Sequence, residues 1–411
     1  MNKKMLAAVI LILLLLLPDV SCRTANSSGL TLTEQLGKKI FFDTNLSSSG
    51  TMSCGTCHGS AEGFTGPNID VNAAGAAYPG AVSTRAGNSK PPTIAYASKS
   101  PVLYYDTVHG VWIGGMFWDG RATGKILNDP LAEQAQGPFL NPLEQNLPDA
   151  NSVCNMVAQS GYANLFKQVW GADSLDFSKH DVAGIFDEIA RSISAYEKST
   201  EVNPFSSKYD AYLAGKAKLT AQEMLGLQLF EGKAGCSACH PCQPDKSGNP
   251  PLFTNYTYNN LGMPKNPANP FYQMPALYNP DGTAWIDLGL GGFLQSAGYT
   301  ANVYEPEFGK MKVPTLRNVD LRPYLGFVKA FGHNGYFKSL GNMVHFLNTR
   351  DVGEWPTPEY AATVDHVDTG NLNLTSDEEA AIVAFLKTLS DGYSSTSSAG
   401  TVPSSASRST N

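Results

Sequence analysis

The 411-residue sequence has few charged side chains, few cysteines and few histidines. Charged residues make up 16% of the chain, against 42% hydrophobic residues, and there are seven cysteines and seven histidines. A chain with this much hydrophobic content and so little charge is predicted to be globular, which excludes a disordered protein. The formal net charge of −7 argues against nucleic acid as a partner and mildly favours a basic protein.

Long apolar runs are absent after the N-terminus. The one such run, residues 5–17, follows two lysines and precedes Pro18, which is the order of regions in a secretory signal peptide. This run is too short for a membrane span, so we expect a signal peptide at residues 1–22 and no transmembrane span in the mature chain. Cys22 could carry a lipid anchor, although a lipoprotein signal prefers an apolar residue where this chain has Asp19.

Alternating strand patterns are scarce, whereas helical patterns recur. Helical segments are predicted at residues 32–43, 181–199, 219–235 and 375–389. Thr220 with Glu223, and Thr375 with Glu378, have the spacing of a capping box at a helix start. Long loops rich in glycine, proline and asparagine are expected at residues 59–108 and 262–308, and a disordered tail at residues 394–411.

Two of the helical segments begin alike. "LTEQLGKKIFFD" (32–43) and "LTAQEMLGLQLF" (219–230) share a Leu-Thr start, a Leu-Gly pair and an aromatic ending. Each leads into the pattern Cys-x-x-Cys-His, at residues 54–58 and 236–240. We infer an internal duplication of one unit that is mainly helical and has long loops.

The pattern Cys-x-x-Cys-His is typical of covalent attachment of a c-type haem. The two thiols bind the vinyl groups, and the histidine becomes an axial ligand of the iron. Zinc would need paired ligands close in space, and a redox dithiol would not need the histidine. The chain is therefore predicted to hold two haem c groups, through Cys54, Cys57 and His58 and through Cys236, Cys239 and His240.

The expected fold is mainly α, with two cytochrome c-like haem domains joined by long loops. The first domain is predicted at residues 23–205 and the second at residues 206–393. Because c-type haems are assembled outside the cytoplasm, the signal peptide and the two motifs together predict a periplasmic protein. In that oxidising compartment Cys154 and Cys242 could form a disulfide, if the fold brings them together.

Further motifs resemble those of the bacterial diheme cytochrome c peroxidase family, which includes MauG-type enzymes. They are "RAGNSKPPTIAYAS" (85–98), "FWDGR" (117–121), "QAQGPFLNPLE" (134–144), "KVPTLRNV" (312–319) and "HNG" (333–335). The resemblance covers residues from about 30 to about 390. The segment 117–147, which holds two of these motifs, is itself too polar for a core helix and is expected to form loops and turns.

The resemblance implies that the first haem reacts with peroxide and that His58 is its only strong protein ligand. The distal residues of the family correspond to Gln134, Pro138 and Glu144. A carboxylate such as Glu144 can carry a proton between the two peroxide oxygens, and the amide of Gln134 can hydrogen-bond the peroxide. Trp118 corresponds to the tryptophan that relays electrons between the two haems in the family.

Many members of the family have a histidine that blocks the first haem until the second is reduced. This chain has no histidine between His58 and His109. The first haem is therefore expected to be open, and His109 remains as an alternative blocking ligand. His180, His333 and His366 are expected to be structural polar residues.

The second haem differs from the family at its sixth ligand. Leu347 stands at the position that is methionine in peroxidases and tyrosine in MauG, and leucine cannot bind iron. Met343 lies one helical turn earlier, while His345 would point elsewhere if the segment is helical. The sixth ligand is then Met343 or a residue from another loop, or the iron is five-coordinate.

The resemblance also implies a calcium ion between the domains. The corresponding ligands are the side chain of Asn88 and the backbone carbonyls of Leu321 and Pro323, and oxygen ligands of this kind are typical of calcium. An insertion near residues 326–332 follows this segment.

Three functions agree with these features. The first is a periplasmic peroxidase that reduces hydrogen peroxide with electrons from a cytochrome c or a cupredoxin. The second is a MauG-like enzyme that oxidises tryptophan or tyrosine of a partner protein, which the missing blocking histidine favours and Leu347 disfavours. The third is a diheme electron carrier without catalysis. Members of the family are often dimers, so a homodimer is also left open.

Overall fold

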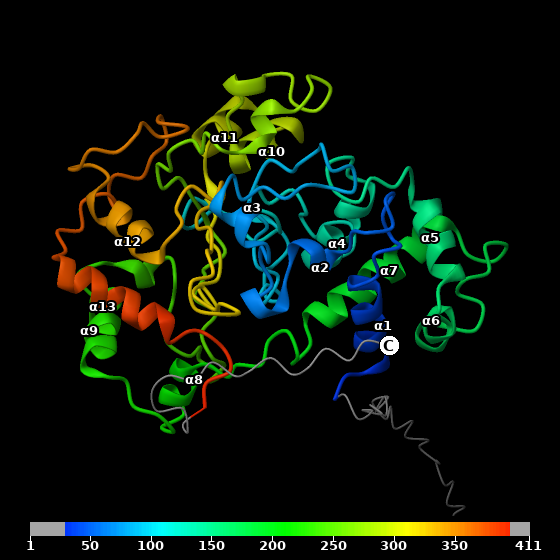
Figure 1. The fold of residues 1–411 in the computed structure, drawn as a ribbon, viewed down its shortest axis with the longest axis horizontal. Coiled ribbons are helices and arrows are strands. Elements are labelled where there is room, and N and C mark those ends of the chain that lie inside the picture. The colour runs from blue at the N-terminus through cyan, green and yellow to red at the C-terminus, as the bar shows by residue number, and fades with distance from the viewer. Residues whose placement is uncertain (1–28, 395–411) are drawn as a thin grey trace, which may run out of the picture.

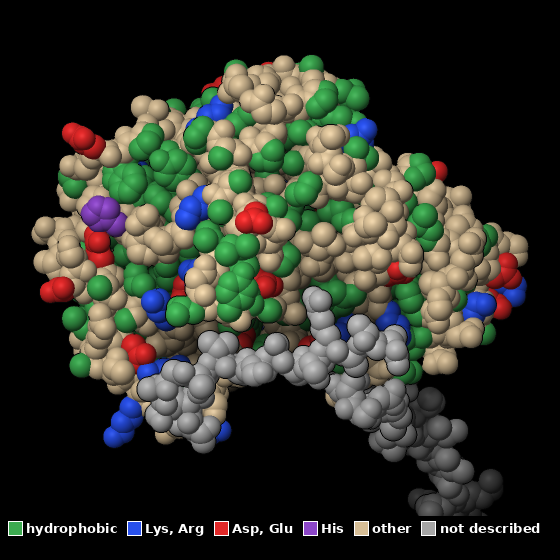
Figure 2. Space-filling view, viewed as in Figure 1, with side chains coloured by type: hydrophobic (Ala, Val, Ile, Leu, Met, Phe, Trp, Pro, Cys, Tyr) green, Lys and Arg blue, Asp and Glu red, His purple; other side chains and the backbone are tan. Residues whose placement is uncertain are grey.

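The computed structural model describes residues 29–394 and is mainly helical (Figure 1). The predicted signal peptide with Cys22, and the tail apart from its first residue, lie outside the described residues. In the part of the chain described, no helix has both the length and the apolar character to cross a membrane. On the face drawn in Figure 2, acidic and basic side chains are scattered among polar and apolar ones and form no large patch of one sign.

The first helical unit is built around α1 (Leu32–Phe41), which begins at a capping box between Thr31 and Glu34. Its apolar side packs against α7 (Val182–Glu197), the longest described helix of this unit. Three more helices complete the unit: α4 (Pro130–Leu140), α5 (Ala150–Gln159) and α6 (Ala163–Trp170). Its buried core is formed by residues between 36 and 202.

The second unit repeats this plan on the opposite side of the molecule (Figure 1). Helix α9 (Ala221–Glu231) packs against α13 (Ser376–Lys387), and both begin at the predicted capping boxes. Helices α8 (Lys208–Leu213) and α12 (Leu340–Thr349) lie beside this pair. The core of this unit is formed by residues between 209 and 389. The mainly helical fold and its duplication are confirmed, while the domain boundary at residues 205 and 206 stays a prediction.

The Leu-Gly pairs of the duplicated segments lie where the two helix pairs cross. A Cβ atom on Gly37 would be 1.8 Å from the carbonyl oxygen of Ser192 in α7. A Cβ atom on Gly226 would be 1.9 Å from the carbonyl oxygen of Ala381 in α13. No real Cβ can approach a backbone atom so closely, so glycine at these positions lets each pair of helices touch backbone to backbone.

The remaining described elements are short. The other α-helices are α2 (Cys54–Cys57), α3 (Ile69–Ala73), α10 (Gly289–Ser296) and α11 (Ala301–Tyr304). The 3-10 turns are η1 (Ser60–Glu62), η2 (Cys236–Ala238), η3 (Pro270–Gln273), η4 (Gly282–Ala284) and η5 (Glu305–Glu307). Two antiparallel strand pairs join β1 (Tyr104–Asp106) to β2 (Val111–Ile113) and β3 (Tyr258–Asn259) to β4 (Met311–Lys312). The expected scarcity of strands is thus confirmed.

Three segments expected to be loops contain helices, of which 59–108 holds the short helix α3. Segment 117–147 contains α4, whose residues Leu131, Ala135 and Phe139 follow one another at intervals of four and are buried. The polar residues between them masked this apolar stripe, and Pro138 lies inside the last turn of the helix. Segment 262–308 contains α10, whose many glycines have low helix propensity but whose buried face packs in a small apolar cluster.

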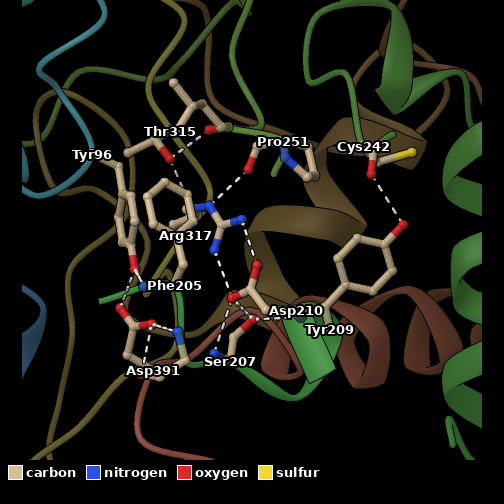
Figure 3. A network of polar contacts seen from close by, with 12 residues as sticks. Tyr96, Phe205, Ser207, Tyr209, Asp210, Cys242, Pro251, Thr315, Arg317 and Asp391 are labelled. Carbon is tan, nitrogen blue, oxygen red and sulfur yellow. Dashed lines mark hydrogen bonds and ion pairs between the residues drawn. The ribbon is translucent and has the colours of Figure 1, made fainter. Parts of the chain in front are cut away.

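The two units meet at Arg317, whose side chain is fully buried (Figure 3). Its guanidinium binds the carboxylate of Asp210 in α8 and donates through Nε to the carbonyl of Pro251. The same group lies over the rings of Tyr96 and Phe205, at 4.8 and 4.5 Å from their centroids. One cation therefore holds together aromatic groups of the first unit and a helix of the second.

Candidate functional site

The first Cys-x-x-Cys-His motif forms the short helix α2 and the residue after it. The Nδ1 atom of His58 lies 3.2 Å from the carbonyl oxygen of Phe64, so Nε2 is the nitrogen left to bind a metal. Burial lowers the pKa of His58 to about 4, which keeps the imidazole neutral as a ligand must be.

The second motif repeats this arrangement. The Nδ1 atom of His240 lies 2.7 Å from the carbonyl oxygen of Phe253, and burial lowers the pKa of His240 to about 4. The four motif cysteines carry free thiols, and burial raises the pKa of Cys57 and of Cys236 to about 12. Paired thiols that form no disulfide, each pair followed by a histidine with one nitrogen held, fit the attachment of a haem c at both motifs.

A narrow cavity adjoins the first motif. The structure brings together on its walls the predicted distal residues and the motif: Cys54, Cys57, His58, Gln134, Pro138 and Glu144. Asn141 donates a hydrogen bond of 2.8 Å to the carboxylate of Glu144. Burial raises the pKa of Glu144, while the charge of Arg121 and the bond from Asn141 oppose the shift. The carboxyl group is thus held beside the motif histidine and takes up a proton more readily than an exposed glutamate.

A second carboxyl group on this cavity, that of Glu197, was not predicted from the sequence. Glu197 of α7 is 2% exposed, and its Oε2 atom has no hydrogen-bond partner within residues 29–394. Burial, and to a lesser extent the charge of Asp129, raise the pKa of Glu197 to about 8. The signal in the sequence was its place on the buried face of α7, one turn after Ile193.

A larger cavity of about 270 Å³ adjoins the second motif. His240, Met343 and Leu347 all line it, so the predicted ligand Met343 and the family position Leu347 lie on the same wall of α12. His345 lies on the same helix but does not line the cavity, and its Nδ1 atom is 2.9 Å from a carboxylate oxygen of Glu379. This agrees with the prediction that His345 points elsewhere if the segment is helical. The part played by Met343 stays a prediction.

A second thioether also lines this cavity. Met263 is 5% exposed and comes from the loop after β3. A lone methionine beside a proline in a loop carries no pattern, so nothing in the sequence pointed to it.

Trp118 lies between the two units. It lines the cavity of His240 and a further small cavity shared with Phe117 and Tyr96. Its indole N–H donates to the carbonyl oxygen of Lys90 at 2.8 Å, and its ring lies 6.4 Å from that of His333. The indole is therefore fixed in orientation on the wall of the second site.

The other histidines lie away from the first cavity. His109 is exposed at the turn between β1 and β2, and its Nδ1 is 2.6 Å from a carboxylate oxygen of Asp106. It lines neither haem-motif cavity, so the alternative of His109 as a blocking ligand is not supported. His180 and His366 are on the surface, whereas His333 is buried and lines the larger cavity.

Two of the predicted calcium ligands already accept hydrogen bonds within the protein. The side-chain oxygen of Asn88 accepts a hydrogen bond from Ser89, and the carbonyl oxygen of Leu321 accepts one from the ammonium group of Lys329. No group of three or more His, Cys, Asp or Glu side chains in residues 29–394 is placed to hold a metal ion. One of the three predicted ligand oxygens thus accepts from a lysine of the insertion at 326–332, and calcium at this place stays a prediction.

The suggested disulfide between Cys154 and Cys242 is wrong. Cys154 is buried in the core of the first unit and Cys242 in that of the second, and both are free thiols. The thiol of Cys154 faces the carbonyl of Val182, and that of Cys242 lies 3.2 Å from a carboxylate oxygen of Glu231. The two sulfur atoms belong to separate cores, which the spacing in the sequence could not reveal.

Comparison with known proteins agrees with this site. A family model described as di-haem cytochrome c peroxidase matches residues 32–218. The chain is 32% identical over 374 residues to methylamine utilization protein MauG of Paracoccus denitrificans, covering 87% of this chain and 88% of that protein. It is 29% identical over 366 residues to cytochrome c551 peroxidase of Nitrosomonas europaea, covering 86% and 79%. The diheme peroxidase BthA of Burkholderia thailandensis has a similar structure, with a TM-score of 0.73, 28% identity and coverage of 87% and 86%. The chain therefore belongs to the di-haem cytochrome c peroxidase and MauG family of haem peroxidases.

Proposed function

We propose that this protein is an exported diheme peroxidase of the periplasm, which reduces hydrogen peroxide with electrons from a cytochrome c or a cupredoxin. The observation that carries the proposal is that Gln134 and Glu144 meet His58 on one cavity beside the first motif. Haem c held by the two motifs would supply the iron that binds peroxide at the first site and the iron that accepts electrons at the second.

The chain's own residues move the proton that cleavage of peroxide requires. Gln134, which is 9% exposed, offers an amide N–H to one peroxide oxygen. The carboxylate of Glu144 accepts the proton of the nearer oxygen and returns it to the farther one, which leaves as water. Two electrons from the donor and two protons from solvent complete the reduction of one hydrogen peroxide to two waters. Trp118, held by Lys90, lies on the path of electrons from the second site.

Turnover of the purified holoprotein tests this function. Reduced cytochrome c or a reduced cupredoxin is mixed with peroxide, and oxidation of the donor is followed by absorbance. Glu144→Gln is expected to lower the rate about 10²–10⁴-fold, because the amide cannot carry the proton. Glu133→Gln is the control, since Glu133 lies on the same helix but its carboxylate accepts hydrogen bonds from the backbone of Gly124, Ile126 and Leu127. It is expected to lose stability and to keep the rate.

No turnover with any donor would contradict the proposal. If the ferric holoprotein also showed only low-spin haem, the carrier function would replace it, since both irons would then be six-coordinate.

A MauG-like function is the second candidate. It is supported by the place of His109 on the surface and by the similarity to a MauG protein over most of both chains. In this case the second site would take electrons from tryptophan or tyrosine side chains of a partner protein. Mass spectrometry of a protein encoded beside this one, produced with and without this chain, distinguishes the two, because an unchanged mass excludes that partner.

A further inference from the structure

The ammonium group of Lys329 is buried between the two units. The side chain belongs to a residue that is 4% exposed, and Nζ donates to three backbone carbonyls. The acceptors are Glu62 at 2.8 Å, Asn318 at 3.0 Å and Leu321 at 3.0 Å. Glu62 belongs to the first unit and the other two to the second, so one lysine joins them.

These contacts require the charged form of the lysine. A neutral amine has two N–H bonds and a lone pair, whereas an ammonium has three N–H bonds and no lone pair. Three carbonyl oxygens can accept hydrogen bonds from one Nζ atom only if that atom belongs to an ammonium group. Burial, with the charge of Lys90 as a lesser cause, lowers the pKa of Lys329 to about 7, so the three acceptors are what stabilises the charge in this place.

A second buried lysine lies close by. Lys90 donates through Nζ to the hydroxyl of Thr65 at 3.0 Å and to the carbonyl of Pro91 at 3.1 Å. Lys90 and Lys329 both line the larger cavity, together with Trp118 and His240. Burial lowers the pKa of Lys90 to about 8, and its charge also helps to lower the pKa of His58 in the first motif, so Lys90 lies between the two motifs.

The surroundings do not offer what a divalent cation needs. Calcium binds six to eight oxygen atoms, and carboxylates are its usual charged ligands. Three acidic groups lie near these residues: the carboxylate of Asp320 is bound by Arg322 at 2.8 Å, that of Asp287 accepts a hydrogen bond from Ser89 at 3.2 Å, and burial raises the pKa of Asp287 and of Glu62. A divalent ion placed here would meet the ammonium group of Lys329 at a predicted ligand oxygen, and carboxyl groups whose pKa burial raises.

We propose that Lys329, with Lys90 beside it, is the resident cation of the junction between the two units, and that the holoprotein neither binds nor requires calcium there. The proposal goes beyond the proposed function and does not depend on it. A positive charge fixed near a redox centre stabilises its reduced form, so these lysines also raise the reduction potential of the haem at the second site.

Metal content and thermal unfolding of the wild-type holoprotein test the first part. After dialysis against a chelator-free buffer, calcium is measured by mass spectrometry, and the melting temperature is measured with EGTA and with added calcium. We expect no stoichiometric calcium and one melting temperature in all conditions. One calcium per chain, or a melting temperature that EGTA lowers and calcium restores, would overturn the proposal.

A pair of variants tests the second part. Lys338 is a matched control, because its Nζ also donates to three backbone carbonyls, of Asn72, Ala74 and Gly335 at 2.6–2.7 Å, but it does not line the larger cavity. Lys329→Met and Lys338→Met are both expected to lower the melting temperature. In a redox titration followed by absorbance, only Lys329→Met should lower the potential of a haem.

Equal haem potentials in the two variants would overturn the assignment of this charge to the second site. If Lys329→Met does not accumulate, the calcium measurements on the wild type still decide the first part. Neither readout uses peroxide, so failure here leaves the proposed function standing.

Discussion

The guanidinium of Arg317 and the carboxylate of Asp210 form a two-pronged ion pair, with Nη1 3.0 Å from Oδ2 and Nη2 2.8 Å from Oδ1 (Figure 3). The arginine side chain is fully buried and the aspartate nearly so. Arg317→Met is therefore expected to lower the free energy of unfolding by about 3–5 kcal/mol, because it leaves a buried carboxylate without its partner. Chemical denaturation of the holoprotein measures this.

The ion pair of Lys38 and Glu201 is the control for that variant. Its Nζ–Oε1 distance is 2.5 Å, but both side chains are more than a third exposed. Lys38→Met is expected to change the free energy of unfolding by about 0–1 kcal/mol, since solvent screens the pair. Equal losses in the two variants would show that burial of Arg317 does not set its contribution.

The same ion pair predicts a dependence of stability on acid. Burial raises the pKa of Asp210, but the hydrogen bonds and charge of Arg317, with Ser207, outweigh it, and the net pKa lies below the ordinary value. A carboxyl whose pKa is lower in the folded state stabilises the protein above its unfolded pKa, and this contribution is lost as the pH falls through the folded pKa. Denaturation of wild type and Asp210→Asn should therefore differ above about pH 4 and converge below it.

Catalysis should depend on pH through Glu144. The carboxylate form accepts the proton, and burial raises the pKa of this group. The rate is therefore expected to rise with pH, with its midpoint above the ordinary value of about 4.3 for a glutamate. A pH profile of peroxide turnover measures the midpoint. The same rising limb in Glu144→Gln would assign it to another group, of which Glu197 is the nearest candidate on the cavity.

The helix crossings predict a strict requirement for glycine. Gly226→Ala and Gly37→Ala should each lower the free energy of unfolding by about 1–3 kcal/mol or more, because the new methyl group meets a backbone carbonyl. Gly341 is the control, since it lies in α12 and a Cβ there meets nothing within 4 Å. Gly341→Ala should be neutral or stabilising by up to about 1 kcal/mol. Thermal unfolding of the three variants measures this. A Gly341→Ala variant less stable than the other two would contradict the explanation.

The sixth ligand of the second haem can be assigned by substitution. If Met343 binds the iron, Met343→Leu should increase the high-spin signal in the electron paramagnetic resonance spectrum of the ferric protein. Met263→Leu should leave that spectrum unchanged, although Met263 lines the same cavity. The reverse pattern would assign Met263, and no change in either would leave the iron without a methionine ligand.

Local chemistry explains which helices could be predicted from the sequence. The capping boxes at Thr220 and Thr375 depend on residues three positions apart, and both helices begin where expected. Helix α4 was not predicted because its apolar stripe is narrow and a proline interrupts its last turn. Only packing against α7 makes those few apolar side chains into a buried face.

The same distinction applies to the site. The two haem motifs are contiguous in the sequence and needed no fold to be recognised. The hydrogen bond from Lys329 to the carbonyl of Glu62 joins residues 267 positions apart, and no local pattern in the sequence predicts it. The same lysine donates to Leu321, a predicted calcium ligand, and this contact exists only once the chain has folded.

The glycine crossings have a consequence for motion in this protein. At Gly37 and Gly226 the two helices of a pair touch backbone to backbone, and no change of rotamer can separate them there, so we expect each pair to move as one rigid body. Any displacement that accompanies a change of redox state must then occur as rotation of one pair relative to the other, or as rearrangement of the loops that connect them. Hydrogen exchange should accordingly be slow in α1, α7, α9 and α13 alike, and the hinge should lie in the segment between α7 and α8.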